Sequence, residues 1–299
     1  MPWLINADQF NKFRRSQKNI LILDASLHMP DAHRDAKQEF AEKHILGASF
    51  FDIDHFSDTH STLPHMLIQD ETVINSKLSA LGIRNDCKII FYDNSDLHSA
   101  CRALWMFKVF GHNPHLLYIL DGGLAAWENF GGKTESGTSS SSPKIYQSRL
   151  QLQHLKTLGQ MKENLHHPHQ QVIDLRHPIR FAGGPEIRPN MRSGHIPGSF
   201  SLPYYILFEK TGCFKPLNKI KQILLSQNIN LSIPMIATCG SAITAPILDF
   251  ILDILQHKEH SVYDGSWTEW GSLTLYPNET SLDERPVEDC LMEGPIPTQ

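Results

Sequence analysis

Residues 233–252 read IPMIATCGSAITAPILDFIL, with a cysteine between two apolar segments. The run Ile233–Thr238 is typical of a buried strand, and the segment from about Ala245 is typical of a largely buried helix. Between them lies a loop of small residues that opens with Cys239. We expect strand, tight loop and helix N-terminus to meet at this thiol, where backbone N–H groups and the helix dipole favour a nucleophilic thiolate. A buried structural cysteine is the alternative interpretation.

The same series of sequence blocks occurs twice along the chain, which indicates a duplicated domain. Short apolar runs alternate with helical patterns in both halves, and this alternation predicts parallel sheets, whose ligands bind beyond the carboxyl ends of the strands. The position of Cys239 is occupied by Asp93 in the first half. The blocks are ILILD (20–24), HILGA (44–48), KIIFYD (88–93), CRALWMF (101–107) and DGGLAAW (121–127), then VIDLR (172–176), HIPGS (195–199), MIATC (235–239), a helix from about 245 and DGSWTEW (264–270).

These repeats predict four parts of the chain. Residues 1–132 form a first domain without the catalytic cysteine, and residues 149–277 form the catalytic domain. Residues 133–148 link the two, because the Gly/Ser-rich stretch 131–143 has little to bury. Residues 278–299, rich in proline and acidic side chains, are expected to form a tail on the surface.

Composition restricts the kinds of partner. The chain has 299 residues, 40% of them hydrophobic and 20% charged, with a formal net charge of −5 and no basic stripe, which argues against nucleic acid. It contains neither an apolar run long enough to cross a bilayer nor signal-peptide features at Met1. Five scattered cysteines without a C-x-x-C pair favour a reducing compartment and argue against zinc. We therefore expect a cytoplasmic protein with no metal, cofactor or membrane partner.

Two motifs resemble the signatures of the rhodanese superfamily: GHIPGS (194–199) and DGSWTEWG (264–271). The resemblance covers nearly the whole chain and implies two tandem rhodanese-like domains, each a parallel sheet flanked by helices. The loop that begins Cys239-Gly240-Ser241 is similar to that of the 3-mercaptopyruvate sulfurtransferases. Members that use thiosulfate typically carry basic residues after the cysteine, and this loop has none before Thr244.

The resemblance also implies an enzyme and its site. Cys239 attacks the sulfur of a small-molecule donor, 3-mercaptopyruvate, and the resulting persulfide passes sulfur to cyanide or to a thiol acceptor such as thioredoxin or a small thiol. Arg180 and Arg188 hold the donor's carboxylate and carbonyl, since a guanidinium grips a carboxylate with two hydrogen bonds. The remaining predicted site residues are Asp54, His65 and Ser241, which would relay a proton, and Gly240, Ala242, Ile243 and Thr244, which would line the binding site.

The chain departs from the family pattern at three places. Ala242 stands where the loop is expected to have glycine, so a positive φ there would cost about 1 kcal/mol or more. Leu46 replaces the proline of the first HIPG copy, and the stretch between Arg180 and Arg188 is one residue shorter. Arg102, in the predicted helix of the first half, is a candidate ion-pair partner between the domains.

Three other functions remain open at this point. A thiosulfate:cyanide sulfurtransferase shares the fold and differs in its donor. A cysteine-dependent phosphatase needs an arginine that closes the thiol loop, but no arginine follows Cys239 before Arg285. A non-catalytic binding module has the same fold, although the presence of Cys239 argues against it.

Overall fold

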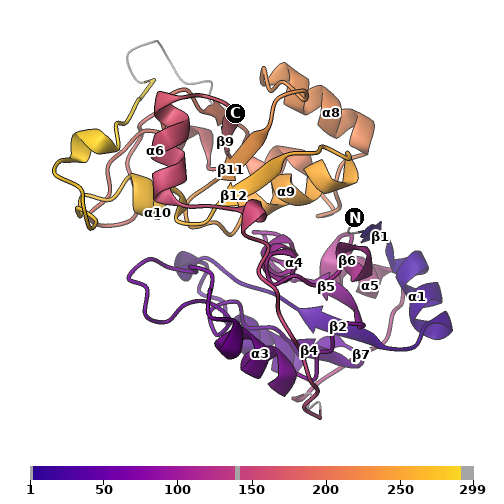
Figure 1. The fold of residues 1–299 in the computed structure, drawn as a ribbon. Helices are drawn as coiled ribbons and strands as arrows, with labels where there is room; N and C mark the ends of the chain where they lie inside the picture. Colours follow the sequence, from indigo (N-terminus) through magenta and orange to yellow (C-terminus); the bar gives the residue numbers. More distant parts are fainter. Residues whose placement is uncertain (1–2, 139–141, 291–299) are drawn as a thin grey trace.

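The computed structural model describes residues 3–138 and 142–290, which form two lobes that follow the two halves of the sequence (Figure 1). The first lobe contains a parallel sheet of β1 (Trp3–Ile5), β2 (Ile20–Asp24), β4 (Ala48–Phe50), β5 (Lys88–Tyr92) and β6 (Leu117–Leu120). The helices around it are α1 (Ala7–Ser16), α2 (Ala36–Glu42), α3 (Glu71–Ala80), α4 (Ala100–Val109) and α5 (Gly123–Asn129).

The second lobe repeats this plan. Its parallel sheet contains β8 (Leu155–Lys156), β9 (Gln171–Asp174), β10 (Phe200–Ser201), β11 (Met235–Thr238) and β12 (His260–Tyr263). The accompanying helices are α6 (Leu158–His166), α7 (Pro178–Phe181), α8 (Leu217–Ser226), α9 (Ala245–Ile254) and α10 (Ser266–Trp270). The predicted architecture of two parallel sheets flanked by helices is confirmed.

Both sheets have the same strand order, which confirms the duplication. The order β4-β2-β5-β6-β1 in the first lobe corresponds to β10-β9-β11-β12-β8 in the second. The central strands β5 and β11 are almost continuous apolar runs, as expected for parallel strands covered on both faces. Cys239 directly follows β11 and Asp93 directly follows β5, so equivalent loops leave the carboxyl edge of the two sheets.

Part of the predicted linker and part of the predicted tail pack against the lobes. Strand β7 (Thr134–Glu135) pairs with β3 (His44–Ile45) of the first lobe, and the Tyr146 side chain is only 2% exposed. In the tail, Arg285 is fully buried, pairs with Glu279 and donates to four backbone carbonyls of the second lobe. The tail is therefore not only a surface extension, because this buried guanidinium fixes it. Residues 139–141 and 291–299 of these two segments lie outside the described chain.

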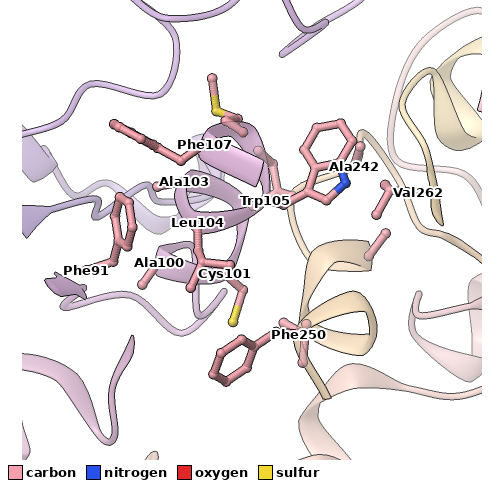
Figure 2. Packing of buried hydrophobic residues seen from close by; sticks show 14 of the residues in the cluster. Phe91, Ala100, Cys101, Ala103, Leu104, Trp105, Phe107, Ala242, Phe250 and Val262 are labelled. Carbon is pink, nitrogen blue, oxygen red and sulfur yellow. The ribbon is translucent and has the colours of Figure 1, made fainter. Parts of the chain in front are cut away.

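The lobes share one hydrophobic core where α4 meets α9. Every residue of α4 is buried, and the cluster around it continues into the second lobe. Figure 2 shows Cys101 and Trp105 projecting from α4. They point towards Phe250, Val262 and Ala242 of the second lobe. A continuous core at this contact fixes the orientation of the two sheets.

A buried group of charges lies at the same contact. Lys108 of α4 donates to Asp249 at 2.6 Å and to Asp253, both on α9. His260 contacts Asp249 through Nδ1 at 2.7 Å. Burial opposes the charged imidazole, but the neighbouring carboxylates outweigh it and raise the pKa of His260 to about 9. Because buried charges are costly without partners, these pairs also specify how α4 docks on α9.

This raised pKa predicts a pH dependence of stability. His260 binds its proton more tightly in the folded protein than in the unfolded chain, where its pKa is about 6.5. Its contribution is therefore complete below about pH 6.5 and is lost as the pH rises through about 9. We expect the free energy of unfolding to fall by up to about 3 kcal/mol over this window. The His260→Gln variant should lack that part of the slope in urea titrations, and equal slopes would contradict the assignment.

Candidate active site

The loop of Cys239 is held in place by the start of α10. The backbone N–H of Cys239 donates to Ser266 Oγ at 3.2 Å. In return, the N–H groups of Trp267 and Thr268 donate to the carbonyls of Cys239 and Gly240 at 3.0 and 2.9 Å. The DGSW block therefore shapes the thiol loop.

The loop presents a run of unused backbone donors. The N–H groups of residues 240–244 donate to no acceptor within the described chain, although these residues are buried. Buried N–H groups are nearly always paired. Successive N–H groups in a tight loop form a concave site for an anion. This loop therefore has the donors to stabilise a thiolate or a persulfide.

Ala242 adopts the conformation that glycine adopts most easily. Its φ is +54°, which costs an alanine about 1 kcal/mol. The residue is fully buried, and its carbonyl accepts from Arg102 Nη1 at 3.4 Å. It does not line the cavity described next. The structure thus gives Ala242 a place in the shape of the loop, away from the predicted binding surface.

A cavity of about 570 Å³ opens in front of Cys239 and is lined by both lobes. Apart from Ala242, all the predicted site residues line this cavity. The Cys239 side chain is only 2% exposed, but it lines this cavity, so it is not sealed in apolar packing. The lining consists of residues 27–31, Asp54, Pro64, His65 and Leu97 of the first lobe, and residues 175–177, Arg180, Ile187, Arg188, Tyr204, 239–241, Ile243 and Thr244 of the second.

The two predicted arginines differ in charge balance. Arg180 forms an ion pair with Glu186, and its Nη2 lies 2.7 and 2.8 Å from the two carboxylate oxygens. Arg188 has no carboxylate within salt-bridge distance among residues 3–138 and 142–290, and its buried Nη1 has no acceptor there. Burial, followed by the charge of Arg180, lowers the pKa of Arg188. Arg188 is therefore the better placed of the two to receive an anionic ligand.

Arg188 is close to the thiol loop. Its Nη2 donates to Ser241 Oγ at 3.3 Å. A Cβ atom on Gly240 would lie 2.8 Å from Arg188 Nη1, so a side chain at this position would displace the guanidinium. The guanidinium of Arg188 and the loop of residues 239–244 form one surface that bears positive charge and hydrogen-bond donors.

The predicted proton relay is partly assembled. His65 Nδ1 contacts Asp54 Oδ1 at 2.6 Å. This hydrogen bond from His65, which outweighs burial, lowers the pKa of Asp54. His65 and Ser241 line the same cavity, but within the described chain no hydrogen bond joins them, and Ser241 contacts Arg188 instead. The structure thus brings Asp54, His65 and Ser241 to one cavity, but no hydrogen bond connects His65 to Ser241 within the described chain.

Comparison with known proteins identifies the family. A family model described as the rhodanese-like domain matches residues 6–130 and 157–273. The chain belongs to the rhodanese family. It is 39% identical over 262 residues to 3-mercaptopyruvate sulfurtransferase of Mus musculus, covering 87% of each chain.

Two further relatives span most of this rhodanese-family chain. Thiosulfate/3-mercaptopyruvate sulfurtransferase 1, mitochondrial, of Arabidopsis thaliana is 38% identical over 286 residues, which cover 88% of this chain and 75% of that protein. The crystal structure of SseA from Escherichia coli, described among 3-mercaptopyruvate sulfotransferases, superposes with a TM-score of 0.80 and 32% identity, covering 90% of this chain and all of that one. The chain is therefore a sulfurtransferase, which moves sulfur from a small-molecule donor to an acceptor.

Sequence reasoning missed Arg176, a third arginine of this rhodanese site. It follows β9, lines the cavity and lies over the Trp267 ring at 4.1 Å. Its Nη2 donates to Asp174 and to the Gly194 carbonyl, both at 2.7 Å, whereas its buried Nη1 has no acceptor in the described chain. Its position after a parallel strand beside β11 is the signal that could have identified it, because such strand ends meet at one edge.

The helices of this rhodanese chain are short. Within residues 3–138 and 142–290, none has the length and apolar character needed to span a membrane.

Proposed function

We propose that this sulfurtransferase takes sulfur from 3-mercaptopyruvate through a persulfide on Cys239 and passes it to a thiol or to cyanide. One observation carries the proposal. Cys239, the guanidinium of Arg188, which has no carboxylate partner in the described chain, and the His65–Asp54 pair line a single cavity between the lobes. A thiol donor with an α-keto carboxylate needs these three features: a nucleophile, an anion site and a group that moves a proton.

The first half-reaction balances as follows. The Cys239 thiolate attacks the donor sulfur, an S–S bond forms and the C–S bond breaks. The electron pair of that bond leaves as the enolate of pyruvate, and the donor's thiol proton is transferred to its methylene carbon. Pyruvate departs, and the anionic persulfide remains beside the N–H groups of residues 240–244, which have no other acceptor in the described chain. An acceptor thiolate then attacks the outer sulfur and regenerates the thiolate of Cys239.

Arg188 would bind the donor's carboxylate, and Arg180 would add positive charge nearby. The planar guanidinium of Arg188 suits a carboxylate, which accepts two parallel hydrogen bonds from such a group. Ser241, which contacts Arg188 at 3.3 Å, would then lie beside the reacting part of the donor. Gly240, Ile243 and Thr244 complete the wall on the side of the nucleophile.

The donor can be identified by mass. Incubation of the full chain with 3-mercaptopyruvate, followed by intact-mass measurement, should show the gain of one sulfur atom, removed again by a thiol or cyanide. The same experiment with thiosulfate tests the alternative donor, which the name of the Arabidopsis relative includes. A persulfide that forms faster from thiosulfate than from 3-mercaptopyruvate would overturn the proposed donor.

The relay makes a separate prediction. His65, oriented by Asp54, and Ser241 would deliver the proton to the enolate carbon, a step absent when thiosulfate releases sulfite. General acid–base groups contribute about 10²- to 10⁴-fold to rate. We therefore expect His65→Gln to slow persulfide formation from 3-mercaptopyruvate by at least about 10²-fold and to spare the reaction with thiosulfate. Equal slowing with both donors in stopped-flow experiments would argue against a proton relay.

The acceptor and the compartment belong to the same proposal. The acceptor would be a small thiol or a thiol on a protein such as thioredoxin, which would enter the cavity that both lobes line. Cys87, Cys101, Cys213 and Cys239 form no disulfide in the structure. Reduced cysteines suit a reducing compartment, so we propose the cytoplasm.

A further inference from the structure

Arg102 contacts both loops that carry the proposed relay. It belongs to α4 of the first lobe, and its side chain is fully buried. Its Nη2 donates to the backbone carbonyl of His65 in the first lobe. Its Nη1 donates to the backbone carbonyl of Ala242 in the second lobe at 3.4 Å. One guanidinium thus connects the residue that holds the imidazole with the residue after Ser241.

A buried carboxylate completes this connection. Asp264, at the start of the DGSW block, accepts from Arg102 Nη1 at 2.8 Å through Oδ1. Its other oxygen accepts from the backbone N–H of Leu67 at 2.8 Å, two residues after His65. The Arg102–Asp264 pair therefore fixes the His65 loop of one lobe against the thiol loop of the other.

The backbone conformations support a positioning role. His65 and Ala242 both have positive φ, +60° and +54°. Such conformations cost about 1–3 kcal/mol each at non-glycine residues and persist where the surroundings hold them. Both carbonyls that Arg102 contacts belong to these two residues. A planar guanidinium has donors in a fixed geometry, so it holds both carbonyls at set relative positions.

We propose that Arg102, paired with Asp264, is a positioning residue that sets His65 against Ser241 across the lobe boundary. The inference rests on the proposed function, because it assumes that His65 acts on the donor. The alternative is that Arg102 only holds the lobes together.

Lys108 provides a matched control for that alternative. It lies on the same helix, is equally buried and also pairs with carboxylates of the second lobe. Its partners Asp249 and Asp253 do not line the cavity. Loss of either cation removes a positively charged partner from buried carboxylates and should destabilise the contact between the lobes. Only loss of Arg102 should also displace His65.

The test compares Arg102→Met with Lys108→Met in the full chain. Persulfide formation from 3-mercaptopyruvate and from thiosulfate is followed by stopped flow, and thermal unfolding is measured alongside. A displacement of about 1 Å in a catalytic group can cost up to about 10²-fold. We expect Arg102→Met to slow the 3-mercaptopyruvate reaction by roughly 10- to 100-fold with little change in KM, and to spare thiosulfate. Lys108→Met should lower the melting temperature and keep the rate with both donors.

Two further variants keep the proposal falsifiable. Arg102→Lys retains the charge next to Asp264 but lacks the planar guanidinium that contacts both carbonyls. The variant should therefore fold and still slow the 3-mercaptopyruvate reaction. The double variant Arg102→Met/His65→Gln should be no slower than His65→Gln alone, because both act at one step. Multiplied losses, or equal slowing by Lys108→Met, would overturn the positioning role. A wild-type chain that forms no persulfide with 3-mercaptopyruvate would instead overturn the proposed function.

Discussion

Cys239→Ser should abolish sulfur transfer from every donor while the fold remains intact. A serine keeps the backbone contacts with Ser266 and Trp267 that hold the loop. Its hydroxyl is not ionised near neutral pH and cannot carry a second sulfur as a persulfide. Removal of a nucleophile typically lowers turnover by about 10⁴-fold or more. Thiocyanate or pyruvate release measured at saturating donor should therefore fall to the background rate.

Cys213→Ser is the control for this variant. Cys213 is partly exposed and does not line the cavity, so the variant should retain full activity and the mass gain of one sulfur atom. If Cys239→Ser still gained that sulfur, another thiol of the chain would be the acceptor. Tandem mass spectrometry would then locate it.

The second large effect is expected at Arg188. Arg188→Met removes the guanidinium that has no carboxylate partner in the described chain and that contacts Ser241. Truncating one member of a buried charge-assisted pair costs about 2–5 kcal/mol. We expect kcat/KM for 3-mercaptopyruvate to fall by about 10²- to 10³-fold, mostly through KM. Steady-state kinetics over a range of donor concentrations would measure this.

Arg180→Met provides the comparison, because Glu186 already neutralises much of the charge of Arg180. Its loss should lower kcat/KM by about 10-fold, clearly less than the loss of Arg188. Arg188→Lys should recover part of the activity, since it restores the charge without the fork. A larger effect at Arg180 than at Arg188 would show that the carboxylate binds elsewhere in the cavity.

The duplicated fold was readable from the sequence because its signals are local. Apolar runs such as KIIFY (88–92) and MIAT (235–238) mark strands buried on both faces. Because these runs occupy equivalent positions in the two halves of the sequence, they predicted two sheets of the same architecture, and the two sheets do have the same strand order. The thiol site followed from the same logic, since Cys239 ends the central strand and strand ends collect at one edge.

Other features depended on contacts that no local pattern records. The sequence indicated Arg180 and Arg188 alike, but only the folded chain pairs Arg180 with Glu186 and leaves Arg188 without a carboxylate partner among the described residues. It predicted a tail on the surface, but Arg285 is buried against carbonyls of α10 and the segment after it. Both outcomes depend on which groups of the folded chain surround the guanidinium at the end of an arginine side chain, and the sequence does not record those contacts.

The sequence by itself determined two parallel sheets, a thiol at the end of the central strand of the second, and the residues available around it. Only the tertiary structure decided how the lobes meet, and with that the connection of His65 to Ala242 through Arg102. The physical reason is range. Strand and helix patterns arise between near neighbours in the chain, whereas the pair Arg102–Asp264 joins residues 162 positions apart, which meet only because the two lobes pack into one shared core.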